Sequence, residues 1–297
     1  MGLSDSEDVL DSMSLRSTKQ VLVAVLTMAM CVVPSLAQKS VTTRGPMPFE
    51  PAEELFYDAE FSKSVLRNLD VAEFKFRTTR TPINTPESEL KNLYSLKFSA
   101  EVSSKGFFTK LFNLRFREQV ESIVEPMSFT IRKSTILDEQ GKRVRQSETT
   151  FDPTKGQISW TQKDPNDPSR EPRNATAQFS GQLQDILSAI YFIRTQPLAV
   201  GKSFEMFISD SGHVYRVPVQ VVERKRMKTI FGKVNVFRVD PDIFGPDSLI
   251  EQEKGQLSLW ITDDNRRVPV GVKIKSDYGI FDIKLKRHVN TIEAARN

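Results

Sequence analysis

The sequence predicts an all-β protein, mainly antiparallel, built as a strongly curved sheet or a barrel-like meander. First, apolar and polar residues alternate along many short segments, most clearly at 94–103, and this is the period of a strand with one buried side. Second, turn-forming residues separate these segments at short spacings, which favours hairpins. Third, we count roughly eleven to thirteen strands, and twist makes a sheet of that size curl, close or split.

The first element is an apolar run at residues 21–33, interrupted only by Thr27. Such a run fits the apolar region of a secretory signal peptide, about 7–15 residues, and falls short of the ~20 that a spanning helix needs. Ser35-Leu36-Ala37 gives the small-x-small pattern of a cleavage site between Ala37 and Gln38. The sequence therefore predicts a signal peptide at residues 1–37 and a secreted, periplasmic protein.

The segment before the apolar run is acidic, whereas the start of a signal peptide is normally basic. The true start is then Met13, or else the signal has a long leading region. Cys31 follows the bulky Met30 inside the apolar run, so we expect no lipoprotein anchor. Because the only cysteine leaves with the signal, the mature chain has no disulfide framework and no thiolate metal site.

Charge and membrane patterning limit the partners of the mature chain. The formal net charge is +4 for the full chain, and 40 basic against 34 acidic residues give about +6 after residue 37, which is too small to indicate nucleic acid. No apolar run after the signal approaches the length that crosses a membrane, so we expect no transmembrane segment after cleavage.

We expect a flexible leader at 38–50, a single β-rich domain at 51–290 and a tail at 291–297. Strand-like alternation marks residues 55–61, 94–102, 114–120, 217–221, 257–261, 268–274 and 281–285. Turn-forming clusters lie at 138–141, 152–156, 210–212, 263–265 and 277–279. Residues 162–179 contain three prolines and predict an irregular surface loop, or the boundary of a two-domain alternative.

One segment, at about 181–196, has helical rather than strand-like spacing. Its apolar residues Leu183, Ile186, Leu187, Ile190 and Tyr191 recur three or four positions apart, which predicts an amphipathic helix. Ser180 is a candidate N-cap, and Pro197 ends the element. This apolar face either packs on the sheet or forms a lid over a hydrophobic cavity, where it would meet a ligand.

A shorter break near 106–112 predicts a helical turn. It carries the apolar cluster Phe107, Phe108, Leu111 and Phe112, with cations on either side. The cluster is either part of the core or an exposed apolar patch suited to lipid or partner contact.

Signals for catalysis are nearly absent. We expect His213 to lie in a solvated turn and His288 at an exposed strand end. No zinc-protease spacing, nucleophile elbow, phosphate loop or dinucleotide fingerprint occurs. Asp263 and Asp264 sit where a turn between two strands is expected, which accounts for them without chemistry. The sequence therefore predicts no enzyme, no cofactor and no metal site.

Two longer strings carry a resemblance to a known family. They are D-I-L-S-A-I-Y-F-I-R-T-Q-P-L at 185–198 and W-I-T-D-D-N-R-R-V-P-V at 260–270. With them, residues 47–287 resemble the bacterial exported family known as domain of unknown function 3108. The resemblance implies export in a Gram-negative host, a mostly antiparallel β domain with an inserted helix, and no established activity. The loop at 164–172 is longer than the family pattern.

The residues of these strings can be given structural roles. Asp185 could cap or anchor the start of the helix, and Arg194 could pair with a carboxylate at its end. Asp264 and Arg267 could lock a hairpin by a charge-assisted hydrogen bond. We expect all four to be structural polar residues.

These observations favour a non-catalytic periplasmic binder of a hydrophobic or lipid-like envelope ligand. The alternative is an envelope scaffold or interaction protein with a solid core and a protein partner. A third hypothesis is a hydrolase that acts on envelope glycan or lipid.

Overall fold

The computed structural model describes residues 47–49, 52–82, 94–106, 109, 115–252 and 254–290. The first eight strands of the chain form one half of the sheet. They are β1 (Glu53–Lys63), β2 (Leu66–Pro82), β3 (Tyr94–Ser104), β4 (Phe116–Glu125), β5 (Thr130–Gln140), β6 (Arg143–Asp152), β7 (Gln157–Lys163) and β8 (Arg173–Gln178). The others are β9 (Leu183–Gln184), β10 (Ser203–Asp210), β11 (His213–Thr229), β12 (Gly232–Pro241), β13 (Gly255–Thr262), β14 (Pro269–Ser276) and β15 (Gly279–Asn290). A helix, α4 (Ile186–Arg194), lies between β9 and β10 along the chain.

All fifteen strands form one sheet in the order β8-β7-β6-β5-β4-β3-β2-β1-β15-β14-β13-β12-β11-β10-β9. Neighbouring strands are antiparallel except for the parallel pair β9 and β10. β1 and β15, from the two ends of the domain, pair with each other within this order. The predicted all-β, mainly antiparallel, strongly curved meander is confirmed.

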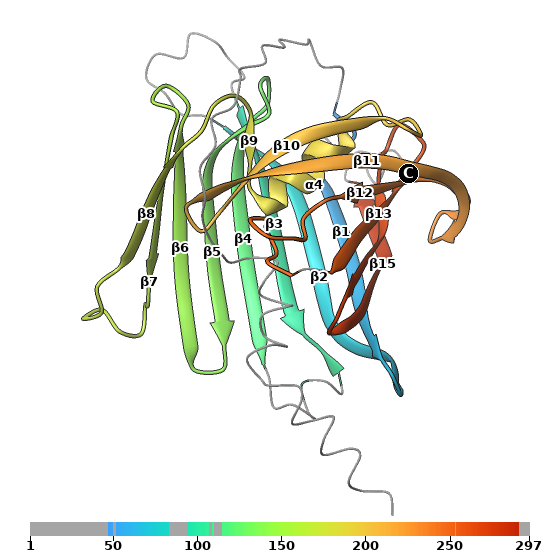
Figure 1. The fold of residues 1–297 in the computed structure, drawn as a ribbon, viewed down its shortest axis with the longest axis horizontal. Helices are drawn as coiled ribbons and strands as arrows, with labels where there is room; N and C mark the ends of the chain where they lie inside the picture. The colour runs from blue at the N-terminus through green and yellow to red at the C-terminus, as the bar shows by residue number, and fades with distance from the viewer. Residues whose placement is uncertain are drawn as a thin grey trace, which may run out of the picture.

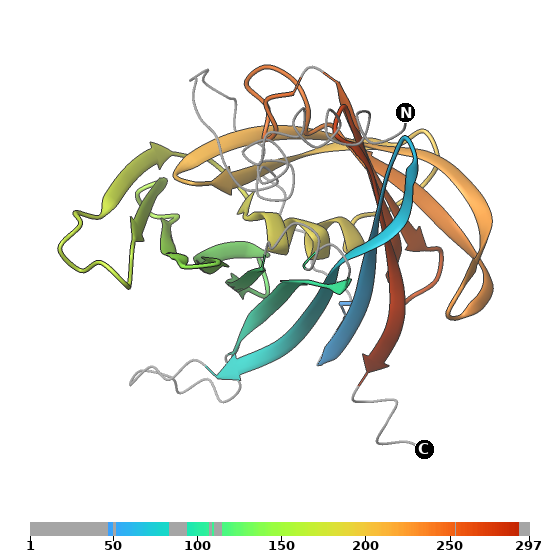
Figure 2. The same ribbon diagram turned by 90° about the horizontal axis from the view of Figure 1, so that it is seen from below.

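The sheet curls until its two edge strands come close without pairing. β8 and β9 are the edges, yet only residues 179–182 separate them in the chain. Seen from below, the strands surround α4 (Figure 2), with β2–β5 on one side and β10–β12 on the other (Figure 1). The sheet is therefore barrel-like but not closed by hydrogen bonds.

The turn between β10 and β11 packs against the β8 edge. Gly212 in this turn has φ +85°, and a Cβ placed there would lie 2.5 Å from the Cβ of Ala175 in β8 and 3.3 Å from that of Trp160 in β7. Only glycine combines this backbone conformation with so close an approach. Side-chain packing thus bridges the gap that hydrogen bonds leave open.

Alternation along the strands determines which side chains enter the interior. In β1, Glu53, Leu55, Tyr57, Ala59 and Phe61 are buried while the residues between them are partly exposed. Each burial class occupies every second position, as the pleat of a strand requires.

Two predictions about strands were wrong. The structure has fifteen strands rather than eleven to thirteen, and β8 lies inside the predicted irregular loop at 162–179. The residues of β8 that point inward are the small Ala175 and Ala177, which remain partly exposed. Small side chains on an edge strand give little hydrophobic contrast, so the alternation is hard to recognise in the sequence.

The helix is shorter and more enclosed than predicted. It spans nine residues, Ile186–Arg194, rather than 181–196; Leu183 lies in β9; and its N-cap is Asp185, not Ser180. Seven of its nine residues are buried. A helix buried on nearly all sides is a core element rather than a surface one.

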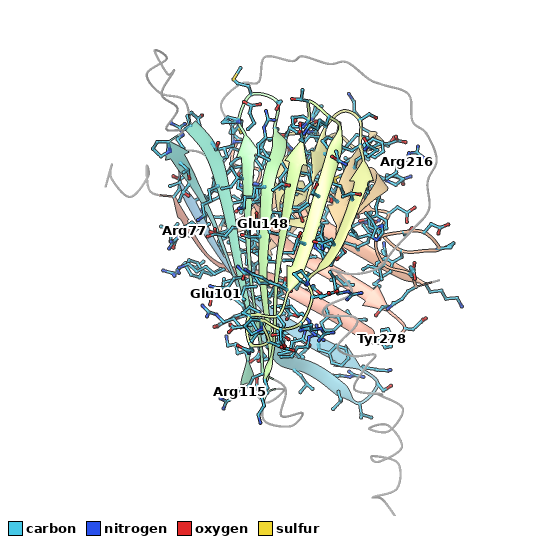
Figure 3. The ribbon with its side chains drawn as sticks, turned by 90° about the vertical axis from the view of Figure 1, so that its left-hand side faces the viewer. Arg77, Glu101, Arg115, Glu148, Arg216 and Tyr278 are labelled. Carbon is cyan, nitrogen blue, oxygen red and sulfur yellow. The ribbon has the colours of Figure 1, made fainter. Side chains whose placement is uncertain are left out.

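Side chains project from the outer face of strands β3 to β6, Glu101 and Glu148 among them (Figure 3), and neighbouring strands form ion pairs there. Lys97 in β3 contacts Glu121 in β4 at 2.6 Å, and Lys133 in β5 contacts Glu148 in β6 at 2.8 Å. Arg117 in β4 lies 2.7 Å from Glu101 in β3. Positive and negative charges on this face are thus matched locally.

Several predictions concern residues that lie outside the described part of the chain. These are the signal peptide at 1–37 with its cleavage site Ala37 and Gln38, the tail at 291–297, and the cluster Phe107, Phe108, Leu111 and Phe112. Within the described residues, no helix has both the length and the apolar character needed to cross a bilayer.

Candidate functional site

The N-terminus of α4 is held by a buried carboxylate. Asp185 accepts a hydrogen bond from the backbone N–H of Ser188 at 2.7 Å, and the Ser188 hydroxyl lies 3.0 Å from the backbone N–H of Asp185, which completes a capping box. The other carboxylate oxygen accepts from the hydroxyls of Ser122 in β4 at 2.5 Å and Ser134 in β5 at 2.7 Å. Asp185 therefore joins the helix to two strands of the sheet.

The C-terminal end of α4 carries a buried ion pair. The Arg194 guanidinium donates from Nη1 and Nη2 to the carboxylate of Glu53 in β1 at 2.6 and 2.9 Å, and the two side chains are 0% and 1% exposed. Its remaining N–H groups donate to the backbone carbonyls of Arg266 and Arg267 at 3.1 and 2.8 Å. Every arm of the guanidinium is thus engaged, as a buried charge requires.

Glu53 has a further partner in His288 of β15, whose Nε2 lies 3.1 Å from Glu53 Oε1. Burial alone would raise the pKa of Glu53, but the charge of Arg194 and the hydrogen bond with His288 outweigh it and hold the pKa below its ordinary value. The side chain of His288 is 6% exposed, so the prediction of an exposed strand end was wrong.

Side chains occupy the face of α4 that the sequence suggested for a ligand. Tyr191 is 1% exposed and stacks on Phe98 of β3 with ring centroids 4.0 Å apart. Phe49 meets Tyr191 edge-on at 5.1 Å. Leu187 is 4% exposed and belongs to the same core cluster, while Ile186 and Ile190 are partly buried.

Two carboxyl groups are perturbed without a cationic partner. Burial is the main cause that raises the pKa of Asp210 to about 8, and the negative charges of Glu118 and Asp185 contribute to the rise. A hydrogen bond from Ser211 lowers this pKa but does not offset the burial. Burial also raises the pKa of Glu118 to about 7, with a contribution from Asp138. Asp210 is 5% exposed, and its Oδ2 has no hydrogen-bond partner among the described residues.

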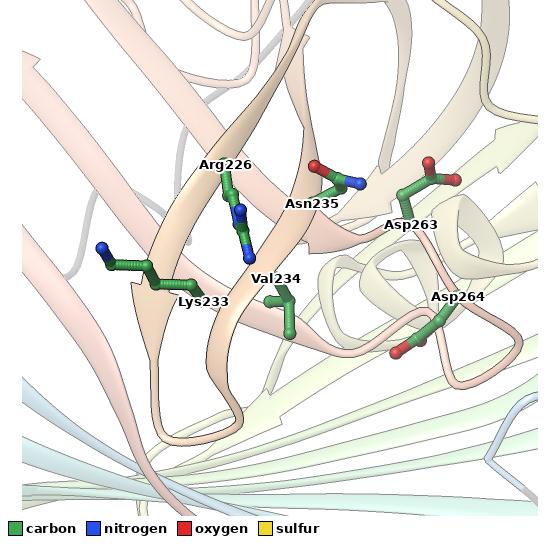
Figure 4. Close-up of a pocket in the computed structure, with 6 residues that line it drawn as sticks. All are labelled: Arg226, Lys233, Val234, Asn235, Asp263 and Asp264. Atoms are coloured by element: carbon green, nitrogen blue, oxygen red, sulfur yellow. The ribbon is translucent and has the colours of Figure 1, made fainter.

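A groove of about 350 Å³ lies on the surface beside the long β11–β12 hairpin (Figure 4). Its walls come from the two strands of the hairpin and from the turn after β13. The lining residues are Arg226, Lys233, Val234, Asn235, Asp263 and Asp264. The turn is attached to the hairpin, because the Asp263 N–H donates to the Asn235 carbonyl at 2.9 Å.

In the charged turn at 263–267, beside the groove, the ion pairs differ from the predicted one. Asp264 pairs with Arg266, whose Nη2 and Nε lie 2.6 and 3.0 Å away, and accepts from the Thr262 hydroxyl at 2.8 Å. Arg267 instead points its charge toward Asp263, at 4.0 Å. The predicted Asp264–Arg267 side-chain pair was therefore wrong, because Arg267 adopts φ +47° and leaves the strand direction.

Sequence reasoning missed the partners of both helix ends, Glu53 and His288 at one and Ser122 and Ser134 at the other. One signal was present for Glu53, which occupies the inward register of β1 with Leu55 and Tyr57. A charge at such a position must find a partner when it is buried. Among the described residues, no group of three or more His, Cys, Asp or Glu is arranged to hold a metal ion.

Similarity to known proteins places the chain in a family of unknown function. The profile of a family described as "Protein of unknown function (DUF3108)" matches residues 57–286. No curated protein matches the chain. A solved structure, the β-barrel-like protein of domain of unknown function DUF1849 from Brucella abortus, is similar at 8% identity and a TM-score of 0.49, covering 80% of this chain and 97% of its own.

Proposed function

We propose that this chain, which belongs to the DUF3108 family of proteins of unknown function, is an exported, non-catalytic interaction protein of the cell envelope. Its core is solid, and its partners meet its hairpins, loops and sheet edges. Export is supported by the apolar run at 21–33 and the cleavage pattern that ends at Ala37.

The observation that carries the solid-core proposal is the enclosure of α4. Seven of its nine residues are buried. Tyr191, on the face that would line a ligand cavity, is in ring contact with Phe49 and Phe98. The two ends of the helix are fixed to the sheet by Asp185 and Arg194. A helix with both ends anchored and its sides packed is poorly suited to act as a moving lid.

A binder of a hydrophobic or lipid-like ligand is the second candidate, favoured by the aromatic lining around α4. To admit an acyl chain, α4 would have to leave Phe49, Phe98 and Phe129, and Arg194 would have to leave Glu53. Separating a buried ion pair of this kind costs about 3–5 kcal/mol when one charge is left behind. The geometry therefore favours the solid core over the carrier.

The two perturbed carboxyl groups are the strongest argument for a hydrolase, since catalytic acids often have raised pKa values. Neither Asp210 nor Glu118 lines the groove at the β11–β12 hairpin. Asp210 is also 5% exposed, which leaves its carboxyl out of reach of a substrate. We therefore propose that their perturbation is a structural consequence of burial.

Native mass spectrometry of protein isolated from the periplasmic fraction tests this proposal directly. We expect a single species at the mass of residues 38–297, with no bound lipid. A stoichiometric lipid that is released on unfolding would overturn the solid core, and recovery of uncleaved protein from the cytosol would overturn export.

Photocrosslinking in intact cells tests the interaction itself. Crosslinking residues would replace exposed positions on the edge strand β8, such as Asn174 and Thr176, and on the interior strand β6, such as Glu148, which has a neighbour on each side. We expect a reproducible protein adduct from the positions on β8 and none from the position on β6. Adducts of equal yield from all positions would contradict a specific surface.

A further inference from the structure

We propose that the groove beside the β11–β12 hairpin binds a phosphate-bearing group, whose oxygens contact the side chains of Arg226 and Lys233. The two cations line the groove from opposite strands of the hairpin (Figure 4). In the register of this hairpin, Arg226 pairs with Asn235 and Lys228 with Lys233, so the four side chains share one face. The hairpin therefore presents three cations and an amide together.

Arg226, Lys228 and Lys233 have no carboxylate partner among the described residues, in contrast to the paired cations on the outer face of β3 to β6. Lys97, Arg117 and Lys133 each pair with a glutamate on a neighbouring strand. Among the described residues, Arg226, Lys228 and Lys233 form no ion pair or hydrogen bond through their side chains, and all three are exposed. Lys228 and Lys233 face each other across the hairpin, and like charges at such positions destabilise it. A bound anion would reduce this repulsion.

The two aspartates of the groove do not neutralise these cations. Asp263 is bound by Arg224 Nε at 2.6 Å and has Arg267 at 4.0 Å. Asp264 is bound by Arg266. Burial would raise the pKa of Asp264, but its hydrogen bonds with Arg266 and Thr262 hold the pKa below its ordinary value. The groove and its immediate partners therefore carry five cations against two carboxylates: Arg224, Arg226, Lys233, Arg266 and Arg267 against Asp263 and Asp264.

Size and donor type favour a phosphate group within this positive site. A volume of about 350 Å³ is at the small end of the range for ligand pockets, roughly 300–1,000 Å³. The guanidinium of Arg226 can bind two phosphate oxygens at once, and Lys233 adds a point charge. The phosphate could belong to a soluble phosphate ester or to a lipid headgroup.

A phosphate site on this hairpin does not depend on a solid core. It concerns exposed residues of β11 and β12, and it would hold equally if the interior around α4 were found to carry a ligand. If no phosphate compound binds, the outcomes expected from mass spectrometry and crosslinking do not change, so failure of this proposal can be told apart from failure of the proposed function.

The test is a binding titration of the mature protein with two soluble probes, inorganic phosphate and glycerol 3-phosphate, followed by backbone amide chemical shifts. The groove variant is Arg226→Gln with Lys233→Gln. The matched control is Arg132→Gln with Lys142→Gln, which removes the same charge from exposed positions on and beside β5. We expect the amide signals of Asn235 and Asp263 to shift in the wild type and in the control.

We expect the groove variant to bind at least about tenfold more weakly, since it loses the charge-assisted hydrogen bonds of Arg226 and Lys233 to the phosphate oxygens. A second arm uses vesicles of phosphatidylglycerol with phosphatidylcholine against vesicles of phosphatidylcholine alone. Sedimentation with the anionic vesicles that the groove variant loses, together with weak soluble binding, assigns the group to a lipid headgroup. Equal weakening by the control, unchanged binding in the groove variant, or no binding of any probe would overturn the proposal.

Discussion

Arg194 is a buried charge that contacts polar groups from two other parts of the chain, β1 and the turn after β13. A fully buried guanidinium is costly to desolvate, and it is tolerated here because a carboxylate and two carbonyls satisfy its N–H groups. Its guanidinium also lies 5.1 Å above the ring of Phe49 and 5.3 Å from that of Tyr191. The same side chain thus joins α4, β1 and the turn between β13 and β14.

Replacing Arg194 by Met should destabilise the protein by about 3–5 kcal/mol, because Glu53 would be left buried without its counter-charge. Urea unfolding monitored by circular dichroism measures the change. The double variant Arg194→Met with Glu53→Leu should recover part of the loss, since it removes the orphaned charge as well. A double variant less stable than the single one would contradict this account.

Asp210 makes the stability of the protein depend on pH. Its pKa is about 8 in the folded chain and near the ordinary ~3.9 when unfolded. Between these values the unfolded chain releases a proton that the folded chain retains, so the free energy of unfolding falls as pH rises from about 4 to about 8. The contribution of protonated Asp210 to the free energy of unfolding is therefore fully present below about pH 4 and lost by about pH 8.

The variant Asp210→Asn cannot titrate at this position, so it should gain stability relative to the wild type as pH rises. We expect a difference on the order of a few kcal/mol at pH 8 and a much smaller one at pH 5. Urea unfolding at the two pH values checks it. A difference that stays constant with pH would show that Asp210 ionises normally in the folded state.

At the scale of elements, α4 is positioned by its cap rather than by its own helical propensity. Nine residues are too few for a stable isolated helix, so tertiary contacts must hold it. Asp185 supplies them at the N-terminus, where it satisfies a backbone N–H and two hydroxyls of the sheet. The sequence pattern placed the cap at Ser180, which is exposed in the structure.

Replacing Asp185 by Ala should cost more than the ~1 kcal/mol of an ordinary N-cap, because Ser122 and Ser134 also lose their acceptor. We expect about 2–4 kcal/mol in thermal or urea unfolding. The matched control Ser180→Ala, at the position that the sequence pattern favoured, should leave stability nearly unchanged. Equal losses in the two variants would argue against the anchoring role of Asp185.

At the scale of the whole molecule, the main question is how an open sheet of fifteen strands holds its curvature. The chain passes from one edge strand to the other through residues 179–182, and the turn at Gly212 packs against β8. These two features bring the edges together without a hydrogen-bonded ladder.

Gly212→Ala should therefore destabilise the protein more than an ordinary glycine substitution in a turn. The matched control is Gly232→Ala, since Gly232 has a similar φ of +80° but nothing within 4 Å of a new Cβ. We expect the control to lose about 1–2 kcal/mol from backbone strain, and Gly212→Ala to lose about 1–3 kcal/mol more from the clash with Ala175. Matching losses in urea unfolding would show that the edge contact contributes nothing.

Prediction from sequence succeeded where the signal is local. Alternation in segments such as 94–102 and the turn cluster at 138–141 predicted β3 and the β5–β6 hairpin, because the pleat and the turn conformations depend on neighbouring residues. The end of α4 was placed near its true position because proline follows it. β8 was missed because its inward residues are alanines.

The candidate site was much less accessible to such reasoning. Glu53 and Arg194 are 141 residues apart in the chain, and Arg226 and Asp263 belong to different hairpins. No local pattern brings these pairs together. The face of α4 was correctly identified as apolar, yet whether it covers a cavity or fills a core depends on what stands opposite.

By itself, the sequence determined the β class, the hairpin turns and a helix ending before Pro197, since each follows from the preferences of a few adjacent residues. The tertiary structure alone decided that the two sheet edges meet around that helix, that Glu53 lies between Arg194 and His288, and that unpaired cations gather beside the Asp263 turn. These outcomes depend on the register and curl of fifteen strands, which is a property of the whole sheet.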